Sequence, residues 1–306
     1  MFKPSATRFA ALAAAASAFA LAGCDGADVE INGQKGVPLS EIEIAGPPPS
    51  EVFLASGDNV ILTEGETFAI TVEGPDTESL RFVRDKDLIG ITRKNGWSGE
   101  SNATIRITMP APKELVIGGA GTIIAPVLAS EADINIGGSG TIEFGKFAGQ
   151  TLGINIGGSG TVKGAGTAKE LEILIGGSGD VIMPGLKADQ AEVTIGGRGD
   201  VAFASDGTVE ANIAGSGEVN VVGNAKCTVE AFGSGTLSCS PTSASAAPVT
   251  KESAAARRRA GATPRARPAA GSAAGCRRTR DSPARWGCAR PRCAGPRPGR
   301  SPRGRP

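Results

Sequence analysis

The chain of 306 residues contains no histidine and no tyrosine, and aromatic residues make up only 4% of it. Histidine is the commonest general base and transition-metal ligand, so its absence excludes a Ser-His-Asp triad, an HExxH zinc site and a zinc finger that uses histidine. The formal net charge of +1 conceals two opposed parts, because residues 25–250 carry 29 acidic and 14 basic side chains whereas residues 251–306 carry 2 acidic and 16 basic ones.

The first 24 residues have the features of an export signal. Lys3 and Arg8 precede an apolar run over residues 9–21 that is too short to span a bilayer as a helix. Residues 21–24, LAGC, match a bacterial lipobox, in which Cys24 is lipidated and becomes the first mature residue. Ordinary cleavage after residues 20–22, ALA, is the alternative. We expect a signal peptide over 1–23, a lipid anchor at Cys24, and an exported, membrane-anchored protein of the cell envelope.

Residues 24–50 contain three consecutive prolines and are expected to form an extended tether after the lipidated cysteine. Residues 51–113 are irregular but resemble strands. Runs of alternating or apolar residues occur at 51–54, 59–62, 68–72 and 103–108. We expect these runs to form the first coils of the domain and a cap over its open end.

A glycine-rich stretch then recurs seven times at intervals of 18 to 20 residues, which indicates a repeat architecture. Each copy has a short alternating run before the glycines and another after them, as expected for two half-buried strands joined by a tight turn. About 19 residues suit one coil of a β-solenoid, in which coils stack ~4.8 Å apart and bury each other's apolar faces. The copies begin at Gly118, Gly137, Gly157, Gly176, Gly196, Ala214 and Phe232.

Aligning the copies predicts three inward-facing columns, most of whose members are β-branched. The first is Ile117, Ile136, Ile156, Ile175, Ile195, Ile213 and Ala231. The second is Leu115, Ile134, Ile154, Ile173, Val193, Ala211 and Val229. The third, after the turn, is Ile123, Ile142, Val162, Val181, Val201, Val219 and Leu237.

Two motif matches fail on inspection. Residues 140–146 imitate a phosphate-binding loop, but Phe147 stands where that loop needs Ser or Thr, and the segment is predicted to be strand. The calcium-binding β-roll requires GGxGxD on a nine-residue period, whereas here the acid falls one place early and the period is about 19.

Several segments together resemble a known bacterial family, the putative auto-transporter adhesins with a head GIN domain. They are SGDNV at 56–60, LIGI at 88–91, RITMP at 106–110, the serial GGSG[TD] turns, and the closing stretch from Cys227 to Cys239. The resemblance covers roughly residues 51–239. It implies an all-β, right-handed parallel β-helix in the cell envelope, and it brings no catalytic residues.

Two cysteines fall in the last repeat, at inward positions of its two strands. By alignment, Cys227 takes the position of Leu171, and Cys239 takes that of Met183. An exported protein meets an oxidising compartment, so this pair is expected to close as a disulfide that holds the terminal coil. Two separate buried thiols are the alternative.

Acidic side chains recur on the outward face, three positions before the first inward column. They are Glu114, Asp133, Glu172, Glu192 and Glu210, with Gly153 and Thr228 at the other two repeats. A shorter acidic ladder follows the glycine turn at Asp180, Asp200 and Glu218. These ladders suit a solvated face, or a stripe that binds a cationic polymer or weakly holds a divalent cation such as calcium.

These features leave two classes of function. The favoured one is a non-enzymatic envelope lipoprotein whose solenoid surface binds an envelope polymer or protein partner, with no cofactor and no nucleic acid. The other is a polysaccharide-active β-helix enzyme that uses neighbouring surface carboxylates. Against the enzyme, the repeats hold no aromatic platform for sugar rings, since their only aromatic residues are Phe144, Phe147, Phe203 and Phe232.

Residues 240–306 form a basic Arg/Pro/Ala/Gly-rich tail without strand or helix periodicity, and they are expected to be disordered. Two interpretations of the tail stay open. It is either a basic arm that binds anionic polymer or lipid, or the out-of-frame translation of GC-rich sequence.

Overall fold

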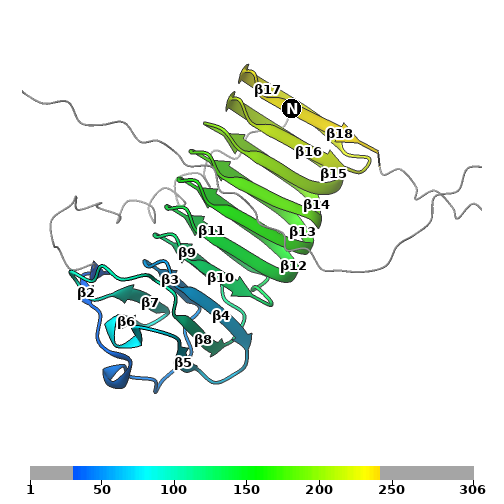
Figure 1. Cartoon of the computed structure of the whole chain (residues 1–306). Helices are drawn as coiled ribbons and strands as arrows, with labels where there is room; N and C mark the ends of the chain where they lie inside the picture. Colours follow the sequence, from blue (N-terminus) through cyan, green and yellow to red (C-terminus); the bar gives the residue numbers. More distant parts are fainter. Residues whose placement is uncertain (1–29, 242–306) are drawn as a thin grey trace, which may run out of the picture. The chain divides into compact units, whose positions relative to one another are not determined.

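The computed structural model describes residues 30–241 of the chain (Figure 1). The predicted signal peptide over 1–23, the predicted lipid anchor at Cys24 and residues 242–306 therefore lie outside the described residues. Within the described part, the structure is built from strands and two short 3-10 helices, and no helix is long and apolar enough to cross a membrane. The strands are β1 (Glu30–Ile31), β2 (Gln34–Lys35), β3 (Glu51–Leu54), β4 (Asn59–Glu64), β5 (Ala69–Glu73), β6 (Leu80–Arg84), β7 (Leu88–Arg93), β8 (Thr104–Met109), β9 (Glu114–Ile117), β10 (Thr122–Ala125), β11 (Glu131–Ile136), β12 (Thr141–Ile156), β13 (Thr161–Ile175), β14 (Asp180–Ile195), β15 (Asp200–Gly215), β16 (Glu218–Val222), β17 (Lys226–Gly233) and β18 (Thr236–Ser240).

From β9 to β18 the chain winds as a β-solenoid, which confirms the predicted fold class. Strands of successive coils pair in parallel, so the segment before each glycine turn stacks on its equivalent in the next coil. The segments after the turns form a second parallel stack in the same way. We call these the pre-turn sheet and the post-turn sheet. Figure 1 shows the coils following one another in sequence order, from green to yellow.

The three predicted apolar columns match the observed register. Ile117 pairs with Ile136, Ile136 with Ile156, and the pairing continues through the later coils to Ala231. Members of these columns up to Ile213 are at most 2% exposed. Burying a branched aliphatic side chain is worth about 1.5–3 kcal/mol, so each pair of stacked coils gains several kcal/mol from these columns in addition to its backbone hydrogen bonds.

Residues 184–187, which include Pro184 and Gly185 and would suit a turn between repeats, are instead part of the continuous strand β14. Strands β12 to β15 each run for 15 or 16 residues, through the corner that joins the post-turn sheet of one coil to the pre-turn sheet of the next. Phe147 and Leu186 turn inward at this corner and are almost fully buried. Their side chains fill the end of the core, and backbone pairing continues past them.

The glycine turns stack with very little space between coils. A Cβ atom on Gly158 would overlap the carbonyl oxygen of Gly138 in the preceding coil, and one on Gly138 would overlap that of Gly119. Neither of these glycines has positive φ, so close backbone approach is the reason for glycine here.

The amino-terminal coils stack in an order that differs from their order in sequence. Strands β3 and β4 form one coil, which pairs in parallel with β9 and β10 on one side. On its other side it pairs in parallel with β7 and β8, which come later in the chain. The antiparallel strands β6 and β5 then cover β7 and β8. The first coils and cap predicted for residues 51–113 are present, but the second coil in the chain lies outermost in the stack.

The prediction of an extended tether over residues 24–50 is wrong for its described part, residues 30–50. Strands β1 and β2 pair in an antiparallel hairpin, and Val37 forms a bridge with Phe82. Ile31 is only 6% exposed because its side chain occupies the space above Gly90, which has no side chain of its own. This segment therefore belongs to the cap.

Candidate binding surface

Carboxylates from successive coils form one column on the outer face of the pre-turn sheet. Backbone register pairs Asp133 with Glu114, and Glu114 in turn pairs with Glu51 of β3. The predicted acidic residues are thus brought together, with one further carboxylate that the sequence did not reveal. We call this set the acidic column. In order along the stack, its positions are Glu51, Glu114, Asp133, Gly153, Glu172, Glu192, Glu210 and Thr228.

The carboxyl groups at the amino-terminal end of this column have raised pKa values, so their ionised forms are destabilised. Burial raises the pKa of Glu114, and the neighbouring Glu51 and Asp133 raise it further, while the hydrogen bond from Asn135 lowers it. Burial likewise raises the pKa of Asp133. Burial is also the main cause of the raised pKa of Glu51, with smaller contributions from Asp87 and Asp85. A cation placed along this stretch would relieve the repulsion.

A ladder of amides runs beside the acidic column. Asn135 donates a hydrogen bond from Nδ2 to Oε1 of Glu114 at 2.8 Å, and Asn155 donates to Oδ1 of Asn135 at 3.1 Å. These bonds run from one coil to the next, so they fix the side-chain orientations on the first coils of the column.

The second predicted ladder lies on the post-turn sheet. Asp180 and Asp200 begin β14 and β15, and Asp200 donates its backbone N–H to Oδ1 of Asp180 at 3.2 Å. Glu218 begins β16 and is in register with Asp200. These three carboxylates therefore form a separate, shorter ladder and do not join the acidic column.

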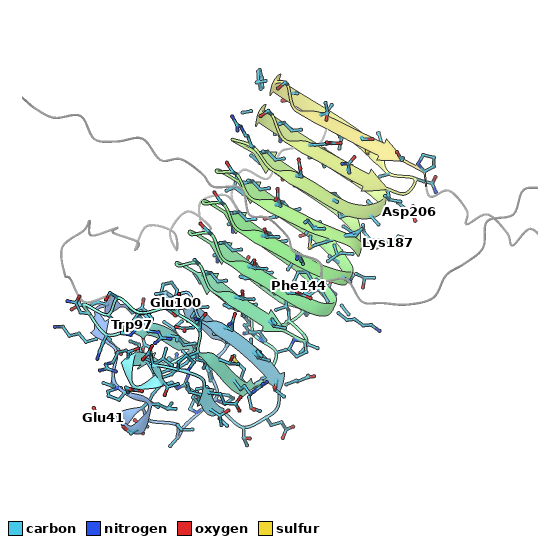
Figure 2. The ribbon with its side chains drawn as sticks, in the orientation of Figure 1. Glu41, Trp97, Glu100, Phe144, Lys187 and Asp206 are labelled. Carbon is cyan, nitrogen blue, oxygen red and sulfur yellow. A yellow bond between two sulfur atoms is a disulfide. The ribbon has the colours of Figure 1, made fainter. Side chains whose placement is uncertain are left out.

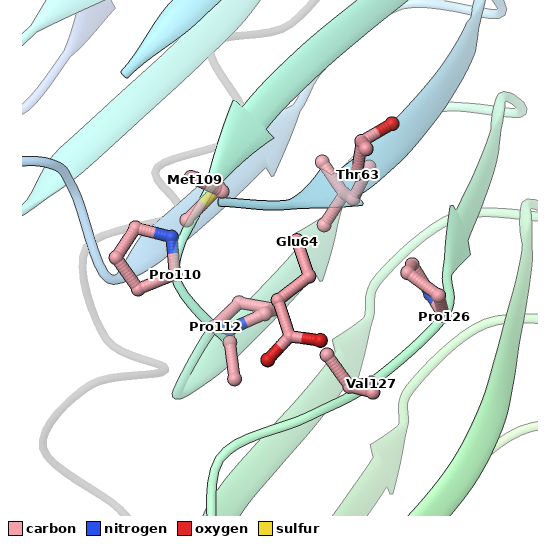
Figure 3. A pocket seen from close by; sticks show the side chains of 9 residues that line it. Thr63, Glu64, Met109, Pro110, Pro112, Pro126 and Val127 are labelled. Atoms are coloured by element: carbon pink, nitrogen blue, oxygen red, sulfur yellow. The ribbon is translucent and has the colours of Figure 1, made fainter. Parts of the chain in front are cut away.

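Neither the acidic column nor the ladder of Asp180, Asp200 and Glu218 forms an enclosed ligand site. Within residues 30–241, no three His, Cys, Asp or Glu side chains converge in a way that could hold a metal ion. Two surface hollows stand out, and neither contains an acidic-column residue. One, beside Glu64 and Pro112, has no room even for water (Figure 3). The other, about 260 Å³ in volume, is lined by Arg93, Lys94 and Trp97, among others.

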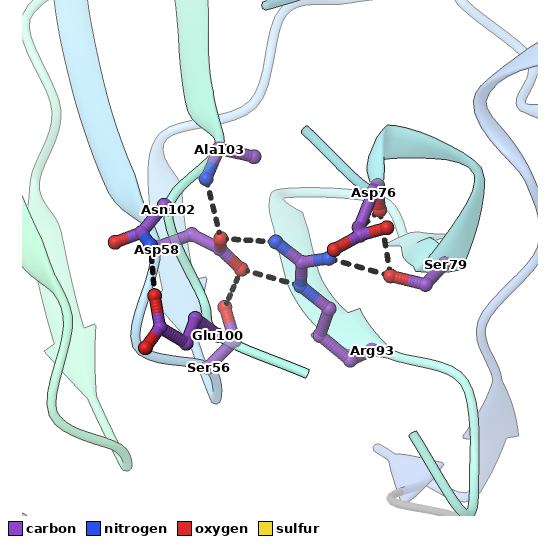
Figure 4. A network of polar contacts seen from close by, with 8 residues as sticks. All are labelled: Ser56, Asp58, Asp76, Ser79, Arg93, Glu100, Asn102 and Ala103. Carbon is purple, nitrogen blue, oxygen red and sulfur yellow. Dashed lines mark hydrogen bonds and ion pairs between the residues drawn. The ribbon is translucent and has the colours of Figure 1, made fainter. Parts of the chain in front are cut away.

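A buried polar network lies under the second hollow (Figure 4). Asp58 is fully buried and forms an ion pair with Arg93, whose Nε donates to Asp58 Oδ2 at 2.9 Å. The backbone N–H of Ala103 and the hydroxyl of Ser56 also donate to the Asp58 carboxylate. Arg93 lies over the ring of Trp97, at 4.1 Å from its centroid. Asp58 already neutralises the charge of Arg93, so the role of this arginine is to join neighbouring coils.

The last coil carries the two cysteines at the predicted positions. Cys227 is in register with Val209 and Cys239 with Val221, and both thiols are half-buried. The structure joins them in a disulfide between the pre-turn and post-turn strands, with the Cα atoms 6.8 Å apart.

An exposed ion pair marks the opposite corner of the solenoid from the glycine turns. Lys187 Nζ lies 2.6 Å from Asp206 Oδ2, and both side chains are about half exposed (Figure 2). Asp206 also accepts the backbone N–H of Asn224, and this bond is the main cause of its lowered pKa. This pair ties the corners of adjacent coils together.

The family profile of the putative auto-transporter adhesins, head GIN domain, matches residues 48–225. This match covers more than half of the chain. The chain belongs to this family. Its solenoid from β3 to β16 is the GIN domain, and the coil of β17 and β18 extends beyond the matched range. A comparison with functionally curated proteins finds no match.

Solved structures of bacterial proteins are similar to this chain. The GIN domain is similar to a putative adhesin of Bacteroides fragilis, with a TM-score of 0.55 and 18% identity over 63% of this chain and 92% of that one. It is also similar to a putative lipid binding protein of Parabacteroides distasonis, with a TM-score of 0.49 and 21% identity over 66% of this chain and 94% of that one. These likenesses concern the fold alone.

Proposed function

We propose that this GIN-domain protein is a lipid-anchored protein of the bacterial cell envelope that binds a cationic surface polymer without catalysing a reaction. The observation that carries this proposal is the acidic column, which presents carboxylates in register on successive coils. Coils stack ~4.8 Å apart, so the column offers a repeated row of negative charge. A polymer with positive groups along its length can contact such a row at several points, and multiple weak contacts add up to useful affinity.

The arrangement supports binding better than hydrolysis of a polysaccharide. A glycosidase pairs a protonated acid with an ionised partner and encloses the sugar between them. Here the acidic column runs along an open sheet, outside both hollows. The raised pKa of Glu114 arises from burial and from the like charges of Glu51 and Asp133. The pKa values of Glu51 and Asp133 are raised too, so these three carboxyls do not divide into an acid and a base.

Binding of chitosan oligosaccharides at mildly acidic pH, where their amines are positively charged, tests the proposal. The full chain should bind them, and the affinity should fall as salt is raised because the attraction is between charges. N-acetylated oligosaccharides of the same length carry no charge and should bind much more weakly.

A pair of double variants identifies the surface. Glu192→Gln with Glu210→Gln removes two charges from the acidic column and should weaken binding about tenfold, whereas Asp180→Asn with Asp200→Asn removes two from the post-turn ladder of nearby coils and should not. Equal loss in both would show that only net charge matters and would refute a role for the column.

Anchoring is tested separately at Cys24. The proposal requires wild-type protein in the membrane fraction with a lipidated Cys24, and release of the Cys24→Ala variant into the soluble fraction. Soluble wild-type protein that begins at Gly23 would contradict the anchor and leave the binding surface to be judged on its own.

A further inference from the structure

The carboxy-terminal end of the solenoid exposes positions that are core in every earlier coil. Val229 is 46% exposed, whereas its register partner Ala211 is 2% exposed. Cys227, Leu237 and Cys239 are only partly buried. Among residues 30–241, β17 pairs only with β15 and β18 only with β16, so no strand covers the last coil. The other end of the stack is covered by the cap.

The outer edge of β17 carries unpaired backbone N–H and C=O groups at alternate residues. Asp133 occupies the same position of the acidic column as Thr228, and its backbone N–H donates to the carbonyl oxygen of Lys113 in the preceding coil. The backbone N–H of Ser234, which follows β17, likewise donates to the carbonyl oxygen of Gly215 in the preceding coil. In a parallel ladder, alternate residues direct their N–H and C=O to opposite sides. The even-numbered residues of β17 therefore face β15, and Cys227, Val229 and Ala231 face the open edge. An unpaired, partly apolar edge strand is a template for another strand.

We propose that this end binds a second copy of the same chain, head to head, with the two β17 strands paired in antiparallel register about a two-fold axis at Thr228. That register places Cys227 opposite Val229 of the second copy, so the residues with free backbone groups exchange hydrogen bonds. It also places Lys226 opposite Glu230 of the second copy, and by symmetry this opposite-charge pair forms twice.

Charge selects this register over its neighbours. Registers with the axis at Val229 or at Glu230 also keep the odd-numbered residues hydrogen-bonded. With the axis at Glu230, two carboxylates would lie opposite each other, which is destabilising. With the axis at Val229, Lys226 would lie opposite Phe232 and have no counter-ion. The axis at Thr228 is the one that matches positive with negative charge across the edge.

The second strand of the last coil accepts the same axis. The disulfide places Cys227 and Cys239 opposite each other on the two sheets, and the strands run in opposite directions, so Ser238 lies across from Thr228. Thr236 donates its N–H to Gly217 of the preceding coil, so the odd-numbered residues of β18 have the free groups. An axis at Ser238 pairs Leu237 with Cys239 of the second copy and covers both half-buried side chains.

Cross-linking in the full chain tests the register directly. Thr228→Cys places two thiols opposite each other at the axis, so the variant should form a disulfide-linked dimer in the envelope, seen on non-reducing gels, well above the background set by wild-type cysteines. Glu210→Cys is the matched control, because Glu210 is the register partner of Thr228 one coil inside the stack. It should stay at background. No dimer with Thr228→Cys, or equal dimer with both, would overturn the proposal.

A charge exchange then tests the Lys226–Glu230 pair. Lys226→Glu should weaken dimerisation of the detergent-solubilised full chain about tenfold, measured by light scattering after gel filtration. Adding Glu230→Lys should restore it. The proposal would be overturned by a wild-type chain that is monomeric at concentrations of tens of micromolar, the result expected if residues after 241 cover this end. It would also be overturned if the double variant did not dimerise again.

Discussion

The fully buried carboxylate of Asp58 pairs with the guanidinium of Arg93 across two coils that neighbour each other in space but are separated by the cap strands in sequence. Each residue lies where the two strands of its coil are connected: Asp58 directly precedes β4, and Arg93 is the last residue of β7. Arg93 also donates to the backbone oxygen of Asp76, which precedes β6. The ion pair thus connects two coils and the cap at one point.

Breaking this pair should be costly. Asp58→Asn leaves Arg93 buried without its counter-charge, and loss of one partner of a buried pair costs about 3–5 kcal/mol. We expect a loss of this size in denaturant unfolding. The exposed pair supplies the control, since Lys187→Gln should leave the unfolding midpoint unchanged. Comparable losses in the two variants would show that the Asp58 site is not special.

The acidic column should make stability depend on pH. The pKa of Glu114 is raised in the folded protein, so between its ordinary value of ~4.3 and the raised value the folded state binds more protons than the unfolded state. The free energy of unfolding should therefore fall as pH rises through that window. Glu114→Gln removes the charge and keeps an acceptor for Asn135. It should stabilise the protein at pH 7 by about 1 kcal/mol and flatten the pH profile. A steeper profile in the variant would contradict the sign.

Two adjacent glycines should respond differently to the same substitution. Alanine at Gly158 would force its Cβ into the carbonyl oxygen of Gly138, and we expect a loss of about 1–3 kcal/mol, as for overpacking elsewhere. Alanine at Gly157 would meet only the Ile136 oxygen, 4.0 Å away, and should be neutral or slightly stabilising. Thermal unfolding of the two variants makes the comparison. Equal effects would mean that backbone freedom, rather than stacking distance, determines the choice of glycine.

The disulfide should hold the last coil. Replacing Cys227 and Cys239 with serine should destabilise that coil by about 3 kcal/mol, the value expected for a loop of this length. Hydrogen exchange should then speed up at β17 and β18 and stay unchanged at β13. Non-reducing peptide mapping of the wild-type protein supplies the direct check, because recovery of both cysteines as alkylatable thiols without reduction would contradict the bond.

The repeat made most of the solenoid predictable from sequence. Inward columns such as Ile136, Ile156 and Ile175 follow from alternation at a fixed period, and each coil supports the same assignment in its neighbours. Period alone also placed Asp133 and Glu192 in one outward column.

Features outside the repeat were not predictable in the same way. The pairing of β7 with β3 is a long-range choice that leaves no periodic trace, so neither the stacking order nor the contribution of Glu51 to the acidic column could be foreseen. The composition of the segment around Ile31 predicts a tether because of its proline-rich end, whereas its packing depends on the missing side chain of Gly90. The Asp58–Arg93 pair joins elements whose neighbourhood only the fold defines.

The inverted order of the first coils has a consequence for how the chain folds as it emerges from its amino terminus. The coil of β3 and β4 emerges first, yet both of its neighbours, β7–β8 and β9–β10, are supplied by residues that emerge later. One face therefore stays uncovered until β8 ends at Met109, and the other until β10 ends at Ala125. After that point each new stretch of about 19 residues can add to a finished edge as it arrives. Folding of the emerging chain would thus have two phases, a lag in which the strands of the first coil are exposed, and then steady growth one coil at a time.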